Sequence, residues 1–283
     1  MQEFSQEITV ASRLAREAGA IIMNIYHAPF AVHFKSPGDP VTEADQKANA
    51  LIVSGLHHAF PNDLIVAEES DRPSGDLLHG RVWYVDPLDG TREFIQKNGE
   101  FSVMIGLAID GQSYLGVVYR PDRQLLYGGI ADCEAWVEEH GERQSLGLLS
   151  IPKTDTLRLA ISRSHRHSHM TDIGQALGVD EEIPCGSVGL KIGLIASGQA
   201  DIYVEPGPYT SAWDACGPEA IIRGAGGQFT DITGTPLLYG AGNLKNTTGL
   251  LASNGALHDK IVQTLAPFAK TVLESTACGK DDH

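Results

Sequence analysis

Two aspartates share a single turn in the stretch WYVDPLDGTREF, residues 83–94. Asp86 and Asp89 are separated only by a proline and a leucine. Two carboxylates held this close repel each other unless a cation lies between them. Oxygen ligands without a nearby cysteine or histidine favour Mg²⁺ over zinc. The turn therefore predicts a magnesium site, while an Asp-rich turn that only caps a helix is the structural alternative.

The residues after the second aspartate predict a phosphate site in the same turn. Gly90 and Thr91 offer backbone N–H groups at the point where TREFIQ could begin a helix. A helix N-terminus preceded by a glycine binds phosphate well, because its free N–H groups point at the anion. One turn could therefore hold both a metal ion and a phosphate.

Further carboxylates occur at the expected boundaries of other elements. Glu68 and Glu69 end a short strand expected over 63–70, Asp45 lies at the start of a helix, and Asp214 precedes another helix. Taken singly, each is more typical of a helix cap or a surface charge. Together they predict a multi-metal carboxylate cage, because sites are built on the loops at the ends of rigid elements.

Hydrophobic periodicity in the first half of the chain predicts helices followed by an antiparallel sheet. Apolar spacing indicates a helix over 6–26, a loop is expected over 35–40, and Thr42 is expected to cap a second helix. Two apolar strands within 101–119 flank an Asp-Gly dipeptide, which is typical of a hairpin with a type I′ turn. Further short strands continue this meander, so we expect an α+β half over residues 1–150.

Strands alternate with helices after about residue 150. This order implies crossover connections and a largely parallel sheet, so residues 151–283 are expected to form an α/β half. We expect the first half to carry most of the metal ligands, and the second half to carry Asp214 and the substrate contacts. A chain of 283 residues can bury a substantial core.

The composition limits the classes of partner. The 21 basic and 36 acidic residues give a net charge of −15, which repels nucleic acid and anionic membranes. No apolar run approaches the roughly 18–20 residues of a membrane helix, and no signal-peptide pattern is visible. The four cysteines are far apart and have no zinc spacing. We therefore expect a reduced, cytoplasmic enzyme with a small-molecule partner, no nucleic acid polymer and no integral membrane segment.

Four motifs, in order and spacing, resemble the inositol monophosphatase superfamily of lithium-sensitive, Mg²⁺-dependent phosphatases. They are GDPVTEAD, AEES, VDPLDGT and WDACGPEAIIRGAGG, and the resemblance covers about residues 8–266. Within the superfamily, DGTREFIQKNGEFSVMIGL, LGVVYRP and ISRSH are most similar to bacterial 3′(2′),5′-bisphosphate nucleotidases of the CysQ type. The resemblance implies a layered αβαβα sandwich with the active site between its halves. It also implies two or three Mg²⁺ ions and inhibition by Li⁺.

The resemblance assigns metal ligands within these motifs. Glu68, Asp86 and the backbone carbonyl of Leu88 are similar to the ligands of a first metal. Asp86, Asp89 and Asp214 are similar to the ligands of a second. These residues include both members of the opening Asp pair, so the resemblance agrees with the metal site predicted from the residues themselves.

The resemblance also assigns catalytic roles. Asp45, with Glu68, resembles the ligands of a third, weaker metal and of the attacking water, and Thr91 resembles the hydroxyl that orients this water with Asp45. The catalytic residues implied are therefore Asp45, Glu68 and Thr91. The N–H groups of Gly90 and Thr91 would hold phosphate oxygens. The residues expected at the substrate phosphate are Leu88, Asp89, Gly90, Thr91 and Asp214.

The substrate end of the site is expected in the second half. By the resemblance, Arg163 and His165 lie beside the nucleotide and contact its second phosphate or base, with a solvated loop as the alternative. Ser187 is expected to cap a helix, and Lys191, on the same helix face, could hold a second phosphate or simply be exposed. Glu205 departs from relatives that often carry a basic residue there, and its stretch, YVEPGPYTSAWD, has one extra residue. Glu205 would repel a phosphate but could accept hydrogen bonds from sugar hydroxyls.

The sequence thus predicts a Mg²⁺-dependent phosphomonoesterase that converts adenosine 3′,5′-bisphosphate to AMP and phosphate. Inositol-1-monophosphatase, or another sugar-phosphate phosphatase on the same metal site, is the alternative. A haloacid dehalogenase-type phosphatase is a rival, but its two motif acids are two positions apart, whereas here they are three apart. A non-catalytic phosphate sensor usually lacks a metal ligand, and here every expected acid is present. The oligomeric state stays open between a monomer and a homodimer.

Overall fold

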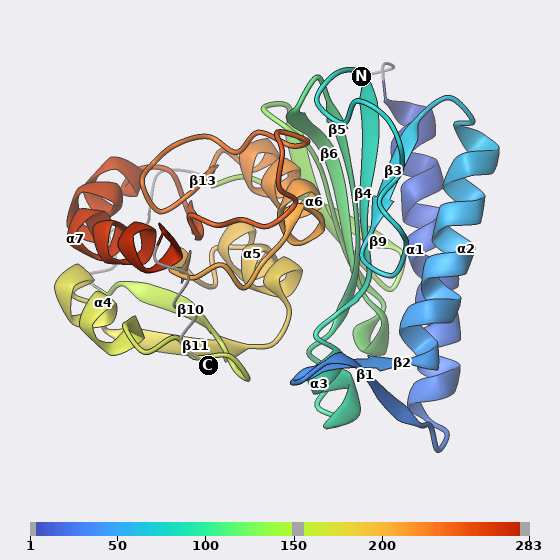
Figure 1. Cartoon of the computed structure of the whole chain (residues 1–283), viewed down its shortest axis with the longest axis horizontal. Coiled ribbons are helices and arrows are strands. Elements are labelled where there is room, and N and C mark those ends of the chain that lie inside the picture. The colour runs from blue at the N-terminus through green and yellow to red at the C-terminus, as the bar shows by residue number, and fades with distance from the viewer. Residues whose placement is uncertain (1–3, 149–155, 278–283) are drawn as a thin grey trace.

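Two long helices form one outer layer of the molecule (Figure 1). The structure is a computed structural model that describes residues 4–148 and 156–277. Helices α1 (Ser5–Tyr26) and α2 (Glu43–Ala59) pack side by side against a sheet. The helix predicted over 6–26 is confirmed. Its buried residues recur at helical spacing and include Ala11, Leu14, Ala18 and Ile22.

Seven strands form the sheet beneath these helices, in the order β3-β4-β5-β6-β7-β8-β9. Only β3 and β4 are parallel, so the antiparallel sheet predicted for the first half is confirmed. The turn between β5 and β6 has positive φ at Asp110 (48°) and Gly111 (75°), as a type I′ turn requires. The strands are β3 (Leu64–Ala67), β4 (Arg81–Asp89), β5 (Ser102–Ile109), β6 (Gln112–Arg120), β7 (Leu125–Ile130), β8 (Glu134–Glu139) and β9 (Glu142–Leu146).

Helices α5 (Val188–Ala196) and α6 (Ala212–Gly224) form the middle layer, between the two sheets (Figure 1). Helix α6 crosses the inner face of the seven-stranded sheet. Glycines permit this close approach, because a Cβ atom on Gly116 of β6 would lie 2.0 Å from the carbonyl oxygen of Gly217 in α6. The approach matters for function, since α6 carries Asp214.

The second sheet has the order β11-β10-β12-β14-β13. Strand β10 pairs in parallel with β11 and β12, whereas β14 is antiparallel to both of its neighbours. The sheet is therefore mixed, and the largely parallel sheet predicted for this half is correct only for the pairs of β10. No helix lies between β13 and β14, so β14 returns antiparallel and inserts between β12 and β13. The strands are β10 (Arg158–Ser162), β11 (Glu181–Cys185), β12 (Ile202–Glu205), β13 (Gln228–Thr230) and β14 (Leu250–Ser253).

Helices α4 (Met170–Leu177) and α7 (His258–Ala277) cover the far face of the second sheet. The five-layer αβαβα sandwich implied by the resemblance is therefore confirmed. One hydrophobic cluster joins the inner faces of both sheets through α5 and α6. The predicted boundary at residue 150 falls outside the described residues, and the division into two halves stays a prediction. None of the helices within the described ranges is long and apolar enough to cross a bilayer.

Three short elements lie near the C-terminal end of β4. Strands β1 (Val32–Ser36) and β2 (Asp39–Thr42) form an antiparallel ribbon, so the loop expected over 35–40 is wrong except for the turn itself. Gly38 has φ +83° in that turn. Helix α3 (Thr91–Ile95) begins directly after β4, as predicted, and packs near the ribbon (Figure 1). A 3-10 turn, η1 (Pro121–Arg123), follows β6.

Candidate metal and phosphate site

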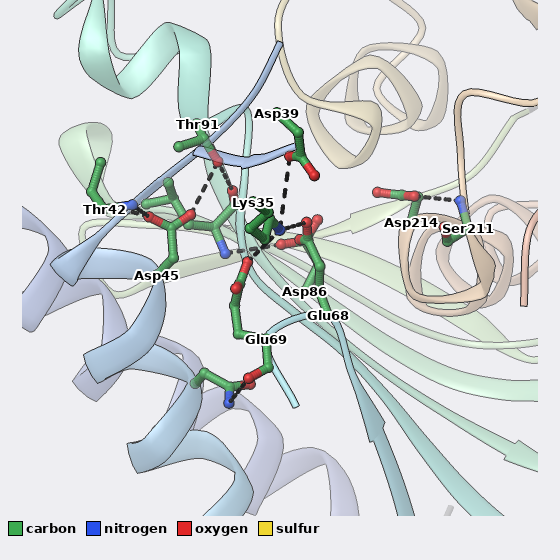
Figure 2. A network of polar contacts seen from close by, with 12 residues as sticks. Lys35, Asp39, Thr42, Asp45, Glu68, Glu69, Asp86, Thr91, Ser211 and Asp214 are labelled. Atoms are coloured by element: carbon green, nitrogen blue, oxygen red, sulfur yellow. Dashed lines mark hydrogen bonds and ion pairs between the residues drawn. The ribbon is translucent and has the colours of Figure 1, made fainter. Parts of the chain in front are cut away.

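Acidic side chains from three elements meet at the C-terminal end of β4 (Figure 2). Carboxylate oxygens of Asp86 and Asp89 on β4 and of Asp214 on α6 all lie within 4.8 Å of one another. Glu68 lies beside them because β3 runs parallel to β4, and the Glu68 N–H donates to the Val85 carbonyl at 3.0 Å. The fold thus brings together four of the five acids predicted as metal ligands.

Burial and mutual repulsion disfavour the fully ionised form of this acidic group unless a cation binds. Asp86 is 2% exposed, and burial together with the charges of Glu68, Asp89 and Asp214 raises its pKa well above the usual range. Burial likewise raises the pKa of Asp214, and the neighbouring Asp89 and Glu68 carboxylates raise it further. Buried carboxylates that repel one another are the donor set for a hard cation, because every ligand is an oxygen. The group therefore fits Mg²⁺.

Asp45 reaches the site from the start of α2. One of its oxygens accepts hydrogen bonds from the Thr42 N–H at 2.8 Å and the Thr42 hydroxyl at 2.7 Å, which confirms the predicted capping box. The other oxygen accepts from the Thr91 hydroxyl at 3.0 Å. The Thr91 hydroxyl also lies 3.2 Å from the carbonyl oxygen of Leu88. The structure thus joins Asp45, Thr91 and Leu88, which the resemblance had placed in one site.

Lys35 of the β1–β2 ribbon is a site residue that sequence reasoning missed. Its ammonium lies 2.6 Å from Glu68 and 2.7 Å from Glu69, at the centre of the network in Figure 2. Burial lowers the pKa of Lys35, but pairing with the two glutamates raises it overall. The lysine neutralises part of the negative charge on the β3 side of the site. Nothing in its local sequence indicated this pairing, because it depends on the position of the ribbon.

The backbone after Asp89 has the conformation that a tight turn into α3 requires. Gly90 has φ +93°, and a Cβ atom there would lie 2.9 Å from the carbonyl oxygen of Glu100. Only glycine fits this position without strain. Helix α3 therefore begins at Thr91, beside the acidic group. The phosphate was predicted at this helix start.

Ser187 links α5 to the acidic group. It caps α5 as predicted, since its oxygen accepts from the Leu190 N–H at 3.2 Å. Its hydroxyl lies 2.5 Å from Asp89 and 2.8 Å from the Ser102 hydroxyl. The N–H of Gly189 adds a hydrogen bond of 3.3 Å to the same Asp89 oxygen. Asp89 is thus held by the middle layer as well as by β4.

Lys191 is buried rather than exposed. It is 1% exposed, and its ammonium donates to the Gly186 carbonyl at 2.8 Å and lies 5.2 Å from the centre of the Tyr203 ring. Burial raises the pKa of Asp89, and the Lys191 charge opposes this rise. The alternative of an ordinary surface lysine is therefore wrong. Lys191 places a positive charge beside the site, while its direct contact with substrate stays a prediction.

Glu205 is also buried, at 5% exposure, near the end of β12. Its carboxylate accepts a hydrogen bond of 3.3 Å from the Gly207 N–H. Burial raises the pKa of Glu205 to about 7, against smaller opposing effects of this hydrogen bond and of Lys191. The side chain therefore carries much less than a full negative charge near neutral pH. This weakens the expectation that Glu205 repels a second phosphate.

The SRSH segment begins with the last residue of β10, and its Ser164 hydroxyl donates a hydrogen bond to Glu93 of α3. Arg163 makes two hydrogen bonds to Glu100, at 2.5 and 2.6 Å, so it is already paired with a carboxylate that sequence reasoning did not identify. His165 is exposed, yet partial desolvation by the surrounding protein and the nearby Arg92 guanidinium lower its pKa. Contacts of Arg163 and His165 with substrate stay predictions.

A family model described as the inositol monophosphatase family matches residues 3–267. This chain belongs to the inositol monophosphatase family. The family and the fold implied by the sequence motifs are thereby confirmed.

Relatives within the family carry nucleotidase names. The 3′(2′),5′-bisphosphate nucleotidase CysQ of Escherichia coli (strain K12) is 39% identical over 231 residues, covering 80% of this chain and 91% of that protein. CysQ of Salmonella typhimurium (strain LT2) is 40% identical, with the same coverage.

Solved structures share this fold. CysQ from Bacteroides thetaiotaomicron, described as a bacterial member of the inositol monophosphatase family, has a TM-score of 0.76 at 28% identity, covering 89% of this chain and 98% of that one. The extragenic suppressor protein suhB from Bartonella henselae has a TM-score of 0.78 at 24% identity, covering 92% of this chain and 98% of that one. At that identity the second likeness shows the fold alone.

Proposed function

We propose that this chain is a Mg²⁺-dependent 3′(2′),5′-bisphosphate nucleotidase that converts adenosine 3′,5′-bisphosphate to AMP and phosphate. It is a phosphoric monoester hydrolase of the inositol monophosphatase family. The main support is that carboxylate oxygens of Asp86, Asp89 and Asp214 lie within 4.8 Å of one another. The chain is also 39–40% identical to proteins named as this nucleotidase.

We assign the acids to metal positions by their resemblance to the family motifs. Glu68, Asp86 and the carbonyl of Leu88 would hold one Mg²⁺, and Asp86, Asp89 and Asp214 a second. Asp45 and Glu68 would hold a third, weaker ion. Bound Mg²⁺ would acidify a water molecule and neutralise the charge of the phosphate and of the leaving oxygen. We also expect Li⁺ to inhibit the enzyme.

The chain's own groups position the reactants. The Thr91 hydroxyl donates to Asp45, so its lone pairs remain available to orient a water molecule toward the phosphate. The N–H groups of Gly90 and Thr91 would hold phosphate oxygens. The water oxygen forms a bond to phosphorus and gives up a proton, the bond from phosphorus to the 3′ oxygen breaks, and this oxygen gains a proton. The products are AMP and inorganic phosphate.

The second phosphate is expected among basic groups of the second half. Lys191 supplies a buried positive charge, and Arg163 and His165 lie at the adjoining edge. The raised pKa of Glu205 supports the bisphosphate, because a largely neutral carboxyl repels it less. The same buried acid could accept a hydroxyl hydrogen bond, which makes inositol 1-phosphate the second candidate substrate.

A substrate panel tests the proposal. We expect adenosine 3′,5′-bisphosphate to have a higher kcat/KM in Mg²⁺ than inositol 1-phosphate or fructose 1,6-bisphosphate. Lys191→Ala should lower kcat/KM for the bisphosphate by about tenfold or more, because one charge-assisted contact is worth about 1.5–3 kcal/mol. Its effect on inositol 1-phosphate should be smaller. A wild type that prefers inositol 1-phosphate would contradict the nucleotidase and favour the second candidate.

The setting of the reaction is also part of the proposal. We expect the enzyme to act in the cytoplasm, since the four cysteines have no disulfide-like or zinc-like spacing. The net charge of −15 favours a small-molecule substrate over a nucleic acid polymer. A homodimer is compatible with this reaction, and sedimentation would measure it.

A further inference from the structure

Two aromatic rings lie together at the ends of neighbouring strands of the second sheet. Tyr209 follows β12 and His167 follows β10, and these strands are paired. The ring centres are 5.9 Å apart, with planes inclined at 56°. Tyr209 is 54% exposed, so much of its ring surface faces solvent despite this contact. Tyr209 also belongs to the stretch with one more residue than its counterparts.

Glycine fixes the position of this tyrosine. A Cβ atom on Gly207 would lie 2.5 Å from the Tyr209 ring and 3.2 Å from the His167 ring. The tyrosine ring therefore lies directly on the main chain at Gly207. The N–H of Gly207 donates to the buried Glu205 carboxylate, which anchors that main chain in turn.

The ring pair adjoins the cationic side of the proposed active site. Ser164, three residues before His167, donates a hydrogen bond to Glu93 of α3, and this helix begins at Thr91. Arg92 directly follows Thr91, which is expected to bind the phosphate. The segment that carries His167 therefore contacts the helix whose first residues are expected to bind the phosphate.

We propose that Tyr209 and His167 form the surface on which the substrate's nucleobase stacks. This inference rests on the proposed nucleotidase function and names the residues that select a nucleoside over a sugar alcohol. Stacking of a base on an aromatic side chain strengthens binding about 5- to 100-fold and needs no base-specific hydrogen bond. The surface should therefore accept either purine base, and it gives no advantage to inositol 1-phosphate.

The test is a titration of AMP, the nucleoside product, into the wild type and Tyr209→Ala by calorimetry, in Mg²⁺. We expect Tyr209→Ala to weaken AMP binding about tenfold or more, and Tyr209→Phe, which keeps the ring, to stay within about twofold. The matched control is Tyr114→Ala. Tyr114 is also exposed, at 40%, but it contacts Phe4 at the start of β6, away from the site.

Kinetics give a second readout. Tyr209→Ala should raise KM for adenosine 3′,5′-bisphosphate with little change in kcat, and should affect inositol 1-phosphate less. Unchanged AMP binding in a Tyr209→Ala protein that melts like the wild type, or equal losses on both substrates, would overturn the aromatic surface. A wild type that hydrolyses no bisphosphate would instead overturn the proposed function, and the AMP titration would still decide the role of Tyr209.

Discussion

Asp89 connects the acidic group at the end of β4 with helix α5 of the middle layer. It belongs to the acidic group of β4, yet it accepts hydrogen bonds from Ser187 and Gly189 of the middle layer. Asp89→Asn removes one negative charge and keeps the shape of the side chain. We expect turnover to fall by at least about 100-fold, as on loss of other transition-state stabilising groups. The fold should remain, because the charge is needed for the metal rather than for the core.

Phosphate release and thermal melting measure these two effects of Asp89→Asn separately. Asp76→Asn is the charge-matched control, because Asp76 is exposed and pairs only locally with His79. It should behave like the wild type. Near-full activity of Asp89→Asn in saturating Mg²⁺ would remove Asp89 from the metal site.

Lys35 forms ion pairs with Glu68 and Glu69 and so offsets part of the negative charge at the site. Lys35→Met removes its pairs with Glu68 and Glu69, so the chain should lose about 1 kcal/mol of stability in EDTA. This corresponds to a decrease in Tm of about 2–4 °C. Added Mg²⁺ should reduce the difference, because the metal then neutralises the same carboxylates. Melting curves in EDTA and in Mg²⁺ check this, and a difference independent of Mg²⁺ would contradict it.

Glu205 should make stability depend on pH. Its pKa is raised from 4.5 to about 7 by burial, so the folded chain retains a proton that the unfolded chain has lost between these values. Folding is therefore penalised progressively as pH rises from 4.5 to 7, and the penalty is constant above 7. Glu205→Gln removes it and should be more stable than the wild type by up to about 3 kcal/mol at pH 8.

Urea unfolding at several pH values measures the Glu205→Gln effect. The two proteins should converge as the pH falls below 4.5, where the carboxyl is protonated in both the folded and the unfolded state, which provides an internal control. A stability difference that is the same at acidic and alkaline pH would show that Glu205 does not titrate as its burial implies.

At the scale of elements, helix α6 must lie close to the sheet for Asp214 to reach β4. Gly116→Ala would put a methyl group 2.0 Å from the Gly217 carbonyl oxygen, so α6 must shift. We expect a loss of about 1–3 kcal/mol or more, together with weaker Mg²⁺ binding. Gly147→Ala, where a Cβ atom meets nothing within 4 Å, is the control. Urea unfolding and Mg²⁺ calorimetry give both readouts, and unchanged Mg²⁺ affinity would contradict the link to Asp214.

Signals from residues close together in the sequence predicted helix caps and turns better than they predicted which strands pair. The Thr42–Asp45 capping box, the Ser187 cap and the Asp110-Gly111 turn depend on neighbours in the chain, and all three are confirmed. The β1–β2 ribbon was missed because its strands are short and the stretch 35–40 across its turn is polar and rich in proline and glycine. The insertion of β14 between β12 and β13 was missed because strand order depends on contacts distant in sequence.

The same distinction applies to the candidate site. The acids were predictable because they occur at element boundaries in recognisable motifs. The pairing of Lys35 with Glu68, the pairing of Arg163 with Glu100 and the burial of Lys191 were not predictable, because they depend on how distant elements pack. The substrate end is the part of the site that depends most on these distant contacts.

The whole molecule carries a net charge of −15, which by itself would repel an anionic substrate. Mg²⁺ bound at the carboxylates would reverse the local charge where the phosphate enters. The five-layer arrangement makes this possible, since it brings Asp214 of α6 to the end of β4 between the two sheets. The enzyme's activity should therefore depend on the metal more than on any single basic side chain.

Phosphate release from adenosine 3′,5′-bisphosphate as a function of Mg²⁺ concentration is the most direct measurement of this claim. We expect release to rise to saturation with Mg²⁺, to stop in EDTA and to return when Mg²⁺ is restored. We also expect Asp214→Asn to lose it. Release that continues unchanged in EDTA, or a folded wild type that releases no phosphate at any Mg²⁺ concentration, would contradict it.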